Sequence, residues 1–224
     1  MNEKQYHHGD LKASLIEAAN IVLVRDGATR LSLRGIAAEV GVSHMAPYAH
    51  FKNKNELIKS VIESGFQQME NAMLDCQKKL TPSNPNLAGE LILAYGVSYI
   101  EFALANPQLY RLMIGESHQS PIVHSQNKNE TEIAEKPILG INSDKEYTKR
   151  INRPFDLLRD AFAMKVNEPL IAKTQALGAW SMVHGLSALL TEGSIQIPES
   201  MSLKQFLATA SSMSFNAEPS QENK

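Results

Sequence analysis

Side chains that could contact DNA gather in one short stretch, residues 31–54. Arginine and lysine pair with guanine edges or phosphates, and hydroxyl and imidazole groups donate to phosphate oxygens. Catalysis would need other groups, and the sequence contains no phosphate-binding loop, nucleophile elbow or pair of catalytic carboxylates. The stretch therefore offers binding chemistry. Its candidate DNA-contacting residues are Arg34, Ser43, His44, Met45, Ala46, Tyr48, His50 and Lys54.

Two short helices joined by a glycine turn are expected to position these side chains. Ser32 can cap a first helix that ends at Gly41, and Ser43 can cap a second that ends near His50. Gly41 can adopt a positive φ without steric cost, as a tight turn requires. The pattern predicts a helix-turn-helix, whose second helix lies in a major groove. The same pattern occurs in helical proteins that bind no DNA, so spacing alone leaves both interpretations open.

The candidate residues divide into two roles within this unit. Ser43, Tyr48 and His50 are positioned to donate to phosphates, and Lys54 opens the next helix, whose N-terminal N–H groups can face the same backbone. Alternatively, Tyr48 lies at the edge of a core and His50 is a hydrogen-bonded cap. The residues expected to face base edges are His44, Met45 and Ala46.

Charge is distributed unevenly along a chain whose net charge is −2. Residues 1–55 hold seven Lys and Arg against five Asp and Glu, so the remaining 169 residues carry −4. A locally basic segment on an acidic body is typical of a nucleic-acid-binding domain joined to a second domain.

Several classes of protein are disfavoured by the sequence. A single cysteine, Cys76, excludes an intramolecular disulfide and a cysteine-rich zinc site. Glu116, His118 and His124 lack metal-ligand spacing, so we expect solvated loop residues there, with no metal and no cofactor. We see no apolar run of about 18–20 residues and no apolar N-terminal signal, and therefore expect a cytoplasmic protein without a membrane span.

Helical periodicity predicts an all-α fold of about nine helices. A long helix capped by Asn53 keeps its apolar residues in phase for almost thirty residues, and a second covers 87–105. Residues 115–151 lose periodicity, and a new helix is expected to start at residues 152–154. Later helices are expected at 169–191 and about 202–215.

The run from YHHGDL through LSLRGIAAEVGVS to YAHFKNKNEL resembles the DNA-binding domain of tetracycline-repressor-type (TetR-like) transcriptional regulators. The segment Tyr48–Lys54 is its most specific part. The resemblance implies a three-helix DNA-binding head, a long connecting fourth helix, and a ligand-binding and dimerisation domain whose last two helices pair in a homodimer. It also implies that Arg34 can reach a base from the second helix.

This resemblance predicts three parts: a helix-turn-helix DNA-binding domain at 1–53, a ligand-binding and dimerisation domain at 54–216, and a polar tail at 217–224. The function that it implies is that of a homodimer on palindromic double-stranded operator DNA. We expect a repressor that a small apolar or amphipathic effector releases from the operator, without enzymatic activity.

A second resemblance lies in AWSMVHGLSALL, residues 179–190. Trp180, His184 and Gly185 look like the Trp-x-x-x-His-Gly (WHG) signature of one C-terminal subtype of this family. Simple packing would also explain a buried tryptophan and a satisfied histidine one turn apart. Aromatic residues on neighbouring helices could complete an apolar pocket. The candidate ligand-binding residues are Tyr95, Tyr99, Phe102, Tyr110, Met113, Phe155, Phe162, Trp180 and His184.

Two rival functions come from other classes. One is an all-α enzyme or ligand-binding protein that uses the pocket around Trp180 and His184, and the missing nucleophile–base pair counts against catalysis. The other is a helical module that binds protein through its helix-turn-helix. The residue types at Tyr48, His50 and Lys54 favour phosphate over a protein partner.

Overall fold

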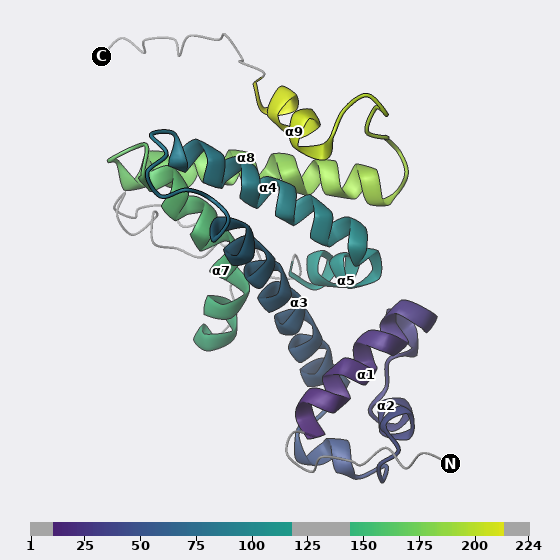
Figure 1. Ribbon diagram of the computed structural model, residues 1–224. Helices are drawn as coiled ribbons and strands as arrows, with labels where there is room; N and C mark the ends of the chain where they lie inside the picture. Colours follow the sequence, from purple (N-terminus) through teal and green to yellow (C-terminus); the bar gives the residue numbers. More distant parts are fainter. Residues whose placement is uncertain (1–10, 118–143, 213–224) are drawn as a thin grey trace, which may run out of the picture.

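The computed structural model describes residues 11–117 and 144–212 (Figure 1). Within those ranges every regular element is a helix, which confirms the expected all-α fold. Asp10, expected to cap the first helix, and the tail at 217–224 lie outside the described residues. The described elements are α1 (Leu11–Asp26), η1 (Ala28–Arg30), α2 (Leu33–Val40), η2 (Ala46–Ala49), α3 (Lys54–Gln77), α4 (Leu87–Ala105), α5 (Pro107–Ser117), α7 (Lys145–Ala163), α8 (Pro169–Thr191) and α9 (Leu203–Ser211).

A small head and a larger body share one long helix (Figure 1). The head consists of α1, η1, α2, η2 and the first turns of α3; the body consists of the rest of α3 with α4, α5, α7, α8 and α9. α3 has 24 residues, which makes it about 36 Å long at 1.5 Å per residue. In the body, α4, α5 and α7 pack against α3, α8 packs on α4 and α7, and α9 packs on α4.

Three predicted caps of the head are confirmed. The Ser32 hydroxyl accepts the backbone N–H of Gly35 at 3.1 Å, and Gly41 ends α2 with φ 81°. The Asn53 side chain accepts the backbone N–H of Glu56 at 3.0 Å and starts α3. Ser32 and Asn53 satisfy N–H groups that the first turn of a helix leaves without a partner, whereas the N–H of Gly41 donates to the carbonyls of Ala37 and Ala38 at the end of α2. α3 ends at Gln77, earlier than its apolar periodicity predicts.

An apolar core and one exposed ion pair hold α1 and α2 together. Arg25 on α1 donates two parallel hydrogen bonds to Glu39 on α2, with Nη1–Oε1 2.9 Å and Nη2–Oε2 3.0 Å. The paired guanidinium lowers the pKa of the Glu39 carboxyl. The largest side chains of the head core are Leu15, Leu23, Ile36, Phe51 and Leu57.

The second helix of the helix-turn-helix differs from the prediction. A helix capped by Ser43 was expected, but the chain forms a turn followed by the 3-10 helix η2, which Met45 precedes without a side-chain cap. Pro47 has no N–H to donate back to the Ser43 carbonyl. That carbonyl instead accepts the N–H of Ala46 at 3.0 Å, which tightens the turn into 3-10 geometry.

The start of α7 also differs from the prediction. The expected start at residues 152–154 is wrong, because α7 begins two turns earlier and carries Pro154 in its interior. Asp144 caps it by accepting the backbone N–H of Tyr147 at 3.0 Å. Proline is costly inside a helix, but Tyr147, Ile151 and Pro154 are all buried. This packing keeps the first turns helical through the proline.

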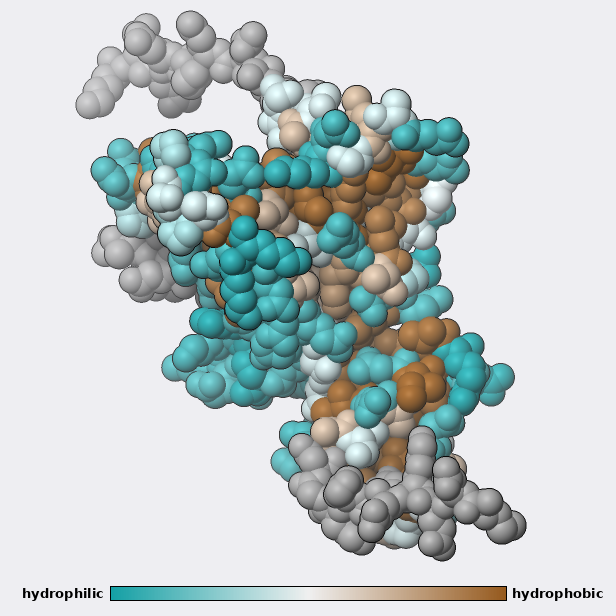
Figure 2. Space-filling view, in the orientation of Figure 1, coloured by the Kyte–Doolittle hydropathy of each residue, from teal (hydrophilic) through white to brown (hydrophobic). Residues whose placement is uncertain are grey.

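α4 corrects the expectation that no segment is apolar and long enough to span a membrane. By length and composition its 19 residues meet that requirement, with a mean hydropathy of 1.4. In the fold, however, Tyr95, Tyr99 and Ile100 are buried among neighbouring helices. On the face shown in Figure 2, hydrophobic surface gathers over α4 beside α9, whereas the α7 side is largely hydrophilic. Its packing is therefore that of a core helix.

Candidate DNA-contacting surface and ligand cavity

The candidate DNA-contacting residues lie on the head, mostly with exposed side chains. Met45 is 72% and Tyr48 44% exposed, although both are large and partly apolar. Ala46 and Lys54 are half-buried. The exposed candidates on α2 and around η2 also include Arg34, Ser43, His44 and His50.

The local fold of η2 explains why these side chains face outward. Pro47 and Phe51 are buried, and the Phe51 N–H donates to the Pro47 carbonyl at 2.9 Å. The Lys12 ammonium on α1 lies 5.9 Å from the centroid of the Phe51 ring, within cation–π range. With two residues anchored inward, Tyr48 and His50 between them remain exposed. α2 packs on η2, so Arg34 and the turn belong to one surface unit.

The cations of the head differ in their partners. Arg25 is engaged by both Glu39 and Asp26. Within the described residues, Arg34 and Lys54 form no ion pair, and Lys52 reaches Glu56 only at 4.0 Å. Cations without an internal carboxylate are the ones that can neutralise phosphates. The surface is therefore chemically suited to an anionic partner.

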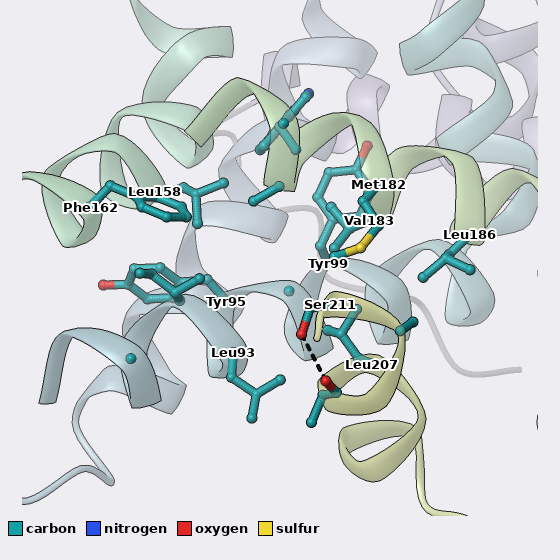
Figure 3. A pocket seen from close by; sticks show the side chains of 18 of the residues that line it. Leu93, Tyr95, Tyr99, Leu158, Phe162, Met182, Val183, Leu186, Leu207 and Ser211 are labelled. Carbon is teal, nitrogen blue, oxygen red and sulfur yellow. Dashed lines mark hydrogen bonds between the residues drawn. The ribbon is translucent and has the colours of Figure 1, made fainter. Parts of the chain in front are cut away.

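A cavity of about 750 Å³ lies in the body. Its walls come from α4, α7, α8 and α9, with Met73 contributed by α3. In Figure 3, Phe162 and Leu158 stand across from Tyr95 and Leu93 near one end, while Leu186 and Leu207 lie toward the other. Both its volume and its mostly apolar lining are those of a small-molecule site.

Four of the nine predicted ligand-binding residues line this cavity: Tyr95, Tyr99, Phe162 and Trp180. Trp180 is 6% exposed and packs edge-on against Tyr99 and Phe155, with ring centroids 4.9 and 5.7 Å away. Edge-to-face packing of this kind fixes the orientation of an aromatic wall. The predicted residues outside the lining are Phe102, Tyr110, Met113, Phe155 and His184.

Polar groups near the cavity are largely paired with one another. The Tyr99 hydroxyl lies 3.0 Å from His184 Nδ1 and donates to the Tyr110 hydroxyl at 3.4 Å. The Tyr110 hydroxyl in turn donates to the His184 carbonyl at 3.3 Å, and the Tyr95 hydroxyl donates to Gln77 Oε1 at 2.7 Å. Burial raises the pKa of Tyr95 to about 12 and also raises the pKa values of Tyr99 and Tyr110. These hydroxyls are thus neutral near pH 7.

Sequence reasoning missed the contribution of α9 to the cavity. Leu207 and Ser211 belong to the lining, and so does Lys165 just after α7. Gly96 on α4 was the available signal, because a Cβ there would lie 2.8 Å from Leu207 Cδ2. A glycine inside an apolar helix often permits such a close approach.

Two sets of contacts join α3 to the body: one comes from the cavity wall α7 and the other from α5. Glu70 on α3 is only 5% exposed and accepts a hydrogen bond from Arg153 Nε on α7 at 3.0 Å. Arg150 and Glu63 form a second ion pair between the same helices. On another side of α3, Gly65 lets Met113 of α5 pack closely. Displacement of α7 or α5 would therefore act on the helix that carries the head.

Metal candidates find little support in the described part of the chain, where no group of three His, Cys, Asp or Glu side chains could hold a metal ion. Glu116 belongs to α5, so the expectation that it lies in a loop is wrong, and His118 and His124 lie outside the described residues. Cys76 is half-buried, and its thiol donates to the Met73 carbonyl at 3.0 Å.

Comparison with known families finds two matches that together cover most of the described chain. The family described as "Bacterial regulatory proteins, tetR family" matches residues 15–61. The family described as "Tetracyclin repressor-like, C-terminal domain" matches residues 92–209, more than half of the chain. The first match covers the head surface and the second covers most of the cavity lining. Assignment to the WHG subtype stays a prediction.

Among curated proteins, the chain is similar to nucleoid occlusion factor SlmA. It is 32% identical over 102 residues to SlmA of Vibrio vulnificus, which covers 44% of this chain and 48% of that protein. It is 31% identical over 121 residues to SlmA of Yersinia enterocolitica, which covers 52% and 57%. The chain thus spans about half the length of these relatives.

Solved structures show the same fold over nearly the whole chain. A protein of unknown function from Rhodococcus sp. RHA1 superposes with a TM-score of 0.68 at 25% identity, covering 94% of this chain and 95% of that one. A tetR-family bacterial regulatory protein from Rhodococcus RHA1 gives a TM-score of 0.54 at 16% identity, with 89% and 91% covered.

Proposed function

The chain belongs to the tetR family of bacterial regulatory proteins, which are DNA-binding transcriptional regulators, and from this premise we propose a repressor that a small apolar or amphipathic effector releases from its operator. Regulators of this family are generally not enzymes, so the proposed mechanism consists of binding alone. One observation carries it: a cation-bearing exposed head and a body with an apolar cavity share one long helix, α3. Because the partner is chromosomal DNA, the protein acts in the cytoplasm.

On DNA, the head divides base reading from phosphate binding. Arg34 pairs with a base edge, since it is exposed on α2 beside the turn. Lys54 contacts a phosphate together with the N-terminus of α3. The other proposed contacts are His44, Met45 and Ala46 to bases, and Ser43, Tyr48 and His50 to phosphates.

Binding to a palindrome requires two heads, and α8 offers the face for a homodimer. Gly178, Ser181 and Gly185 are exposed along one side of α8, and a Cβ at either glycine would meet nothing within 4 Å. Exposed Leu177 and Leu189 flank these small residues. Small residues between leucines allow a helix of a second copy to approach closely. Two heads then reach half-sites about one helical turn apart.

The effector occupies the cavity and changes the separation of the heads. It packs against Tyr99, Phe162 and Trp180, and displaces α7 against α3. Coupling of about 1–3 kcal/mol is enough for regulation and must be reciprocal. Operator DNA therefore weakens effector binding by the same factor by which effector weakens DNA binding.

The decisive experiment selects DNA from a random double-stranded pool with the full chain, and then measures the affinity of the enriched sequence by fluorescence anisotropy. The expected result is a palindrome bound by two copies and released on titration with a hydrophobic compound that alters Trp180 fluorescence. If no sequence were enriched from the pool, the proposal that the protein binds a specific operator would be contradicted. An operator affinity that no cavity-binding compound changes would contradict the effector.

A further inference from the structure

The cavity contains a single formally charged lining residue, Lys165. This residue is exposed and follows the end of α7, where its backbone N–H donates to the Phe162 carbonyl at 2.9 Å. Phe162 lies at one end of the group of side chains labelled in Figure 3. Lys165 therefore brings a positive charge to that end, while the remaining walls are predominantly apolar.

The neighbouring acids are paired with Arg159 and not with Lys165. Asp156 and Asp160, which precede Lys165 on α7, are both bound to Arg159, at 2.6 and 2.8 Å. Within the described residues, Lys165 itself forms no ion pair. No acidic side chain belongs to the lining. A ligand that places a negative charge directly against the Lys165 ammonium therefore meets attraction from a cation that has no carboxylate partner of its own.

The hydroxyl groups of the lining already have partners. Tyr95 donates to Gln77, Tyr99 contacts His184, and the Ser211 hydroxyl donates to the Ala208 carbonyl at 3.0 Å. A ligand that recruits one of these hydroxyls must replace an existing hydrogen bond, which lowers the net gain. The polar lining groups left available for a ligand are the ammonium of Lys165 and the indole N–H of Trp180, and both are donors that suit an anionic or carbonyl oxygen.

Resting on the proposed function, we infer that the effector is an amphipathic anion, such as a carboxylate with an unbranched hydrocarbon chain. Its anionic group binds Lys165 at the exposed end of the cavity. Its chain runs past Phe162 and Trp180 toward Leu207, where burial of apolar surface supplies most of the affinity. The charge supplies selectivity over neutral and cationic molecules of the same length.

Three probes of equal chain length test the charge: decanoate, decan-1-ol and decylamine. Trp180 lines the cavity and is the sole tryptophan, so its fluorescence reports binding of each probe. An exposed ion pair with a charge-assisted hydrogen bond should favour decanoate over decan-1-ol by about three- to tenfold. Decylamine should bind more weakly than the alcohol, and added salt should reduce these differences.

Two substitutions of Lys165 and one control complete the test. Lys165→Met should abolish the preference for decanoate without weakening decan-1-ol, and Lys165→Glu should reverse the preference in favour of decylamine. Lys149→Met, on an exposed lysine of α7 outside the lining, should bind all three probes as the wild type does. Melting curves of each variant exclude unfolding as the cause.

The possible failures are distinguishable. Equal binding of the three probes, or a decanoate preference that survives in Lys165→Met, would overturn the anionic effector and leave the cavity as an effector site. Failure of all three probes to bind would overturn the inference and also count against the effector site of the proposed function.

Discussion

The head surface and the body cavity differ in the kind of contact that their side chains can make. On the head, polar and cationic side chains such as Arg34, Tyr48 and His50 stand exposed on short, capped elements. In the cavity, aromatic walls are fixed by packing, and the Tyr99 hydroxyl is paired inside the protein. One region offers available charge to a large external anion, whereas the other offers enclosed volume to a small molecule.

This contrast explains how one chain can hold two sites whose affinities depend on different physical effects. Affinity for DNA comes mainly from release of counterions, so it depends on salt and tolerates small changes in position. Affinity in an apolar cavity comes from burial and depends on shape. α3, its contacts with α5 and α7, and the packing of α1 on α5 are the elements that can convert a change of shape into a change of head position.

The largest expected effect is the dependence of DNA affinity on salt concentration. Without it, the proposed contrast between the head and the cavity would be wrong. With about six phosphate contacts per dimer, DNA affinity should fall roughly 10³-fold or more between 50 and 200 mM salt. Binding of a neutral probe such as decan-1-ol in the cavity should change little over the same range. Anisotropy and Trp180 fluorescence measure the two affinities. A flat dependence of log K on log salt for DNA would contradict the proposed role of the head.

The next largest effect concerns the free energy of unfolding, which should respond differently to substitutions in the cavity and on the head surface. Trp180→Ala removes a packed cavity wall and should lower the free energy of unfolding by about 3–5 kcal/mol. Met45→Ala truncates a side chain that is 72% exposed, and should change the free energy of unfolding by less than about 0.5 kcal/mol. Urea denaturation measures both. A destabilised Met45→Ala protein would show that the turn belongs to the core and does not serve only as a recognition surface.

Within the head, base reading should separate from phosphate binding. Arg34→Ala should weaken the selected operator by about 1–3 kcal/mol per half-site, with little change on random DNA, if Arg34 pairs with a guanine. Lys54→Ala should weaken both DNAs and lower the salt slope by about one for each contact removed. If Arg34→Ala lowered the affinity for the operator and for random DNA equally, Arg34 would contact a phosphate and would not read a base.

The head was largely predictable because its determinants are local. Ser32, Gly41 and Asn53 act on backbone groups within a few residues, so a single sequence reveals where helices begin and end. The exception was the turn at Pro47, where a missing N–H changed an expected helix into a 3-10 helix. At this turn Met45 is nevertheless exposed, as predicted. The exposure of a side chain depends on which neighbouring residues are buried, and that did not change with the type of helix.

The cavity was predictable only in part because its walls meet across long stretches of sequence. Aromatic periodicity pointed correctly to Tyr99 and Trp180 as lining residues. It could not show that Tyr110 and His184 would form hydrogen bonds with the Tyr99 hydroxyl. Nor could it show that α9 would pack at Gly96 and form one wall of the cavity. Pro154 misled the assignment of α7 because burial of that helix, which no local pattern encodes, offsets the cost of the proline.

The smallest expected effect is an acid response confined to the head, arising from the Arg25–Glu39 pair. The hydrogen bonds from Arg25 lower the pKa of Glu39 below its usual value of 4.5. A group with a lowered pKa in the folded state contributes stability above its unfolded pKa and loses it as pH falls through the folded pKa. Acidification below about pH 4.5 should therefore loosen α1 against α2, and the cavity should show no matching change from this pair.

Glu39→Gln isolates this response because it keeps the shape of the side chain and removes its charge. Hydrogen exchange of α1 and α2 amides between about pH 3 and pH 7, corrected for intrinsic rates, should show a weaker acid dependence in the variant than in the wild type. Asp75→Asn is the matched control, since the Asp75 pKa is likewise lowered, by Lys78, but at the far end of α3. It should leave the exchange of the head unchanged. If wild type and Glu39→Gln lose protection of α1 equally on acidification, the response arises elsewhere, and the pair is an exposed contact without influence on how the head is held.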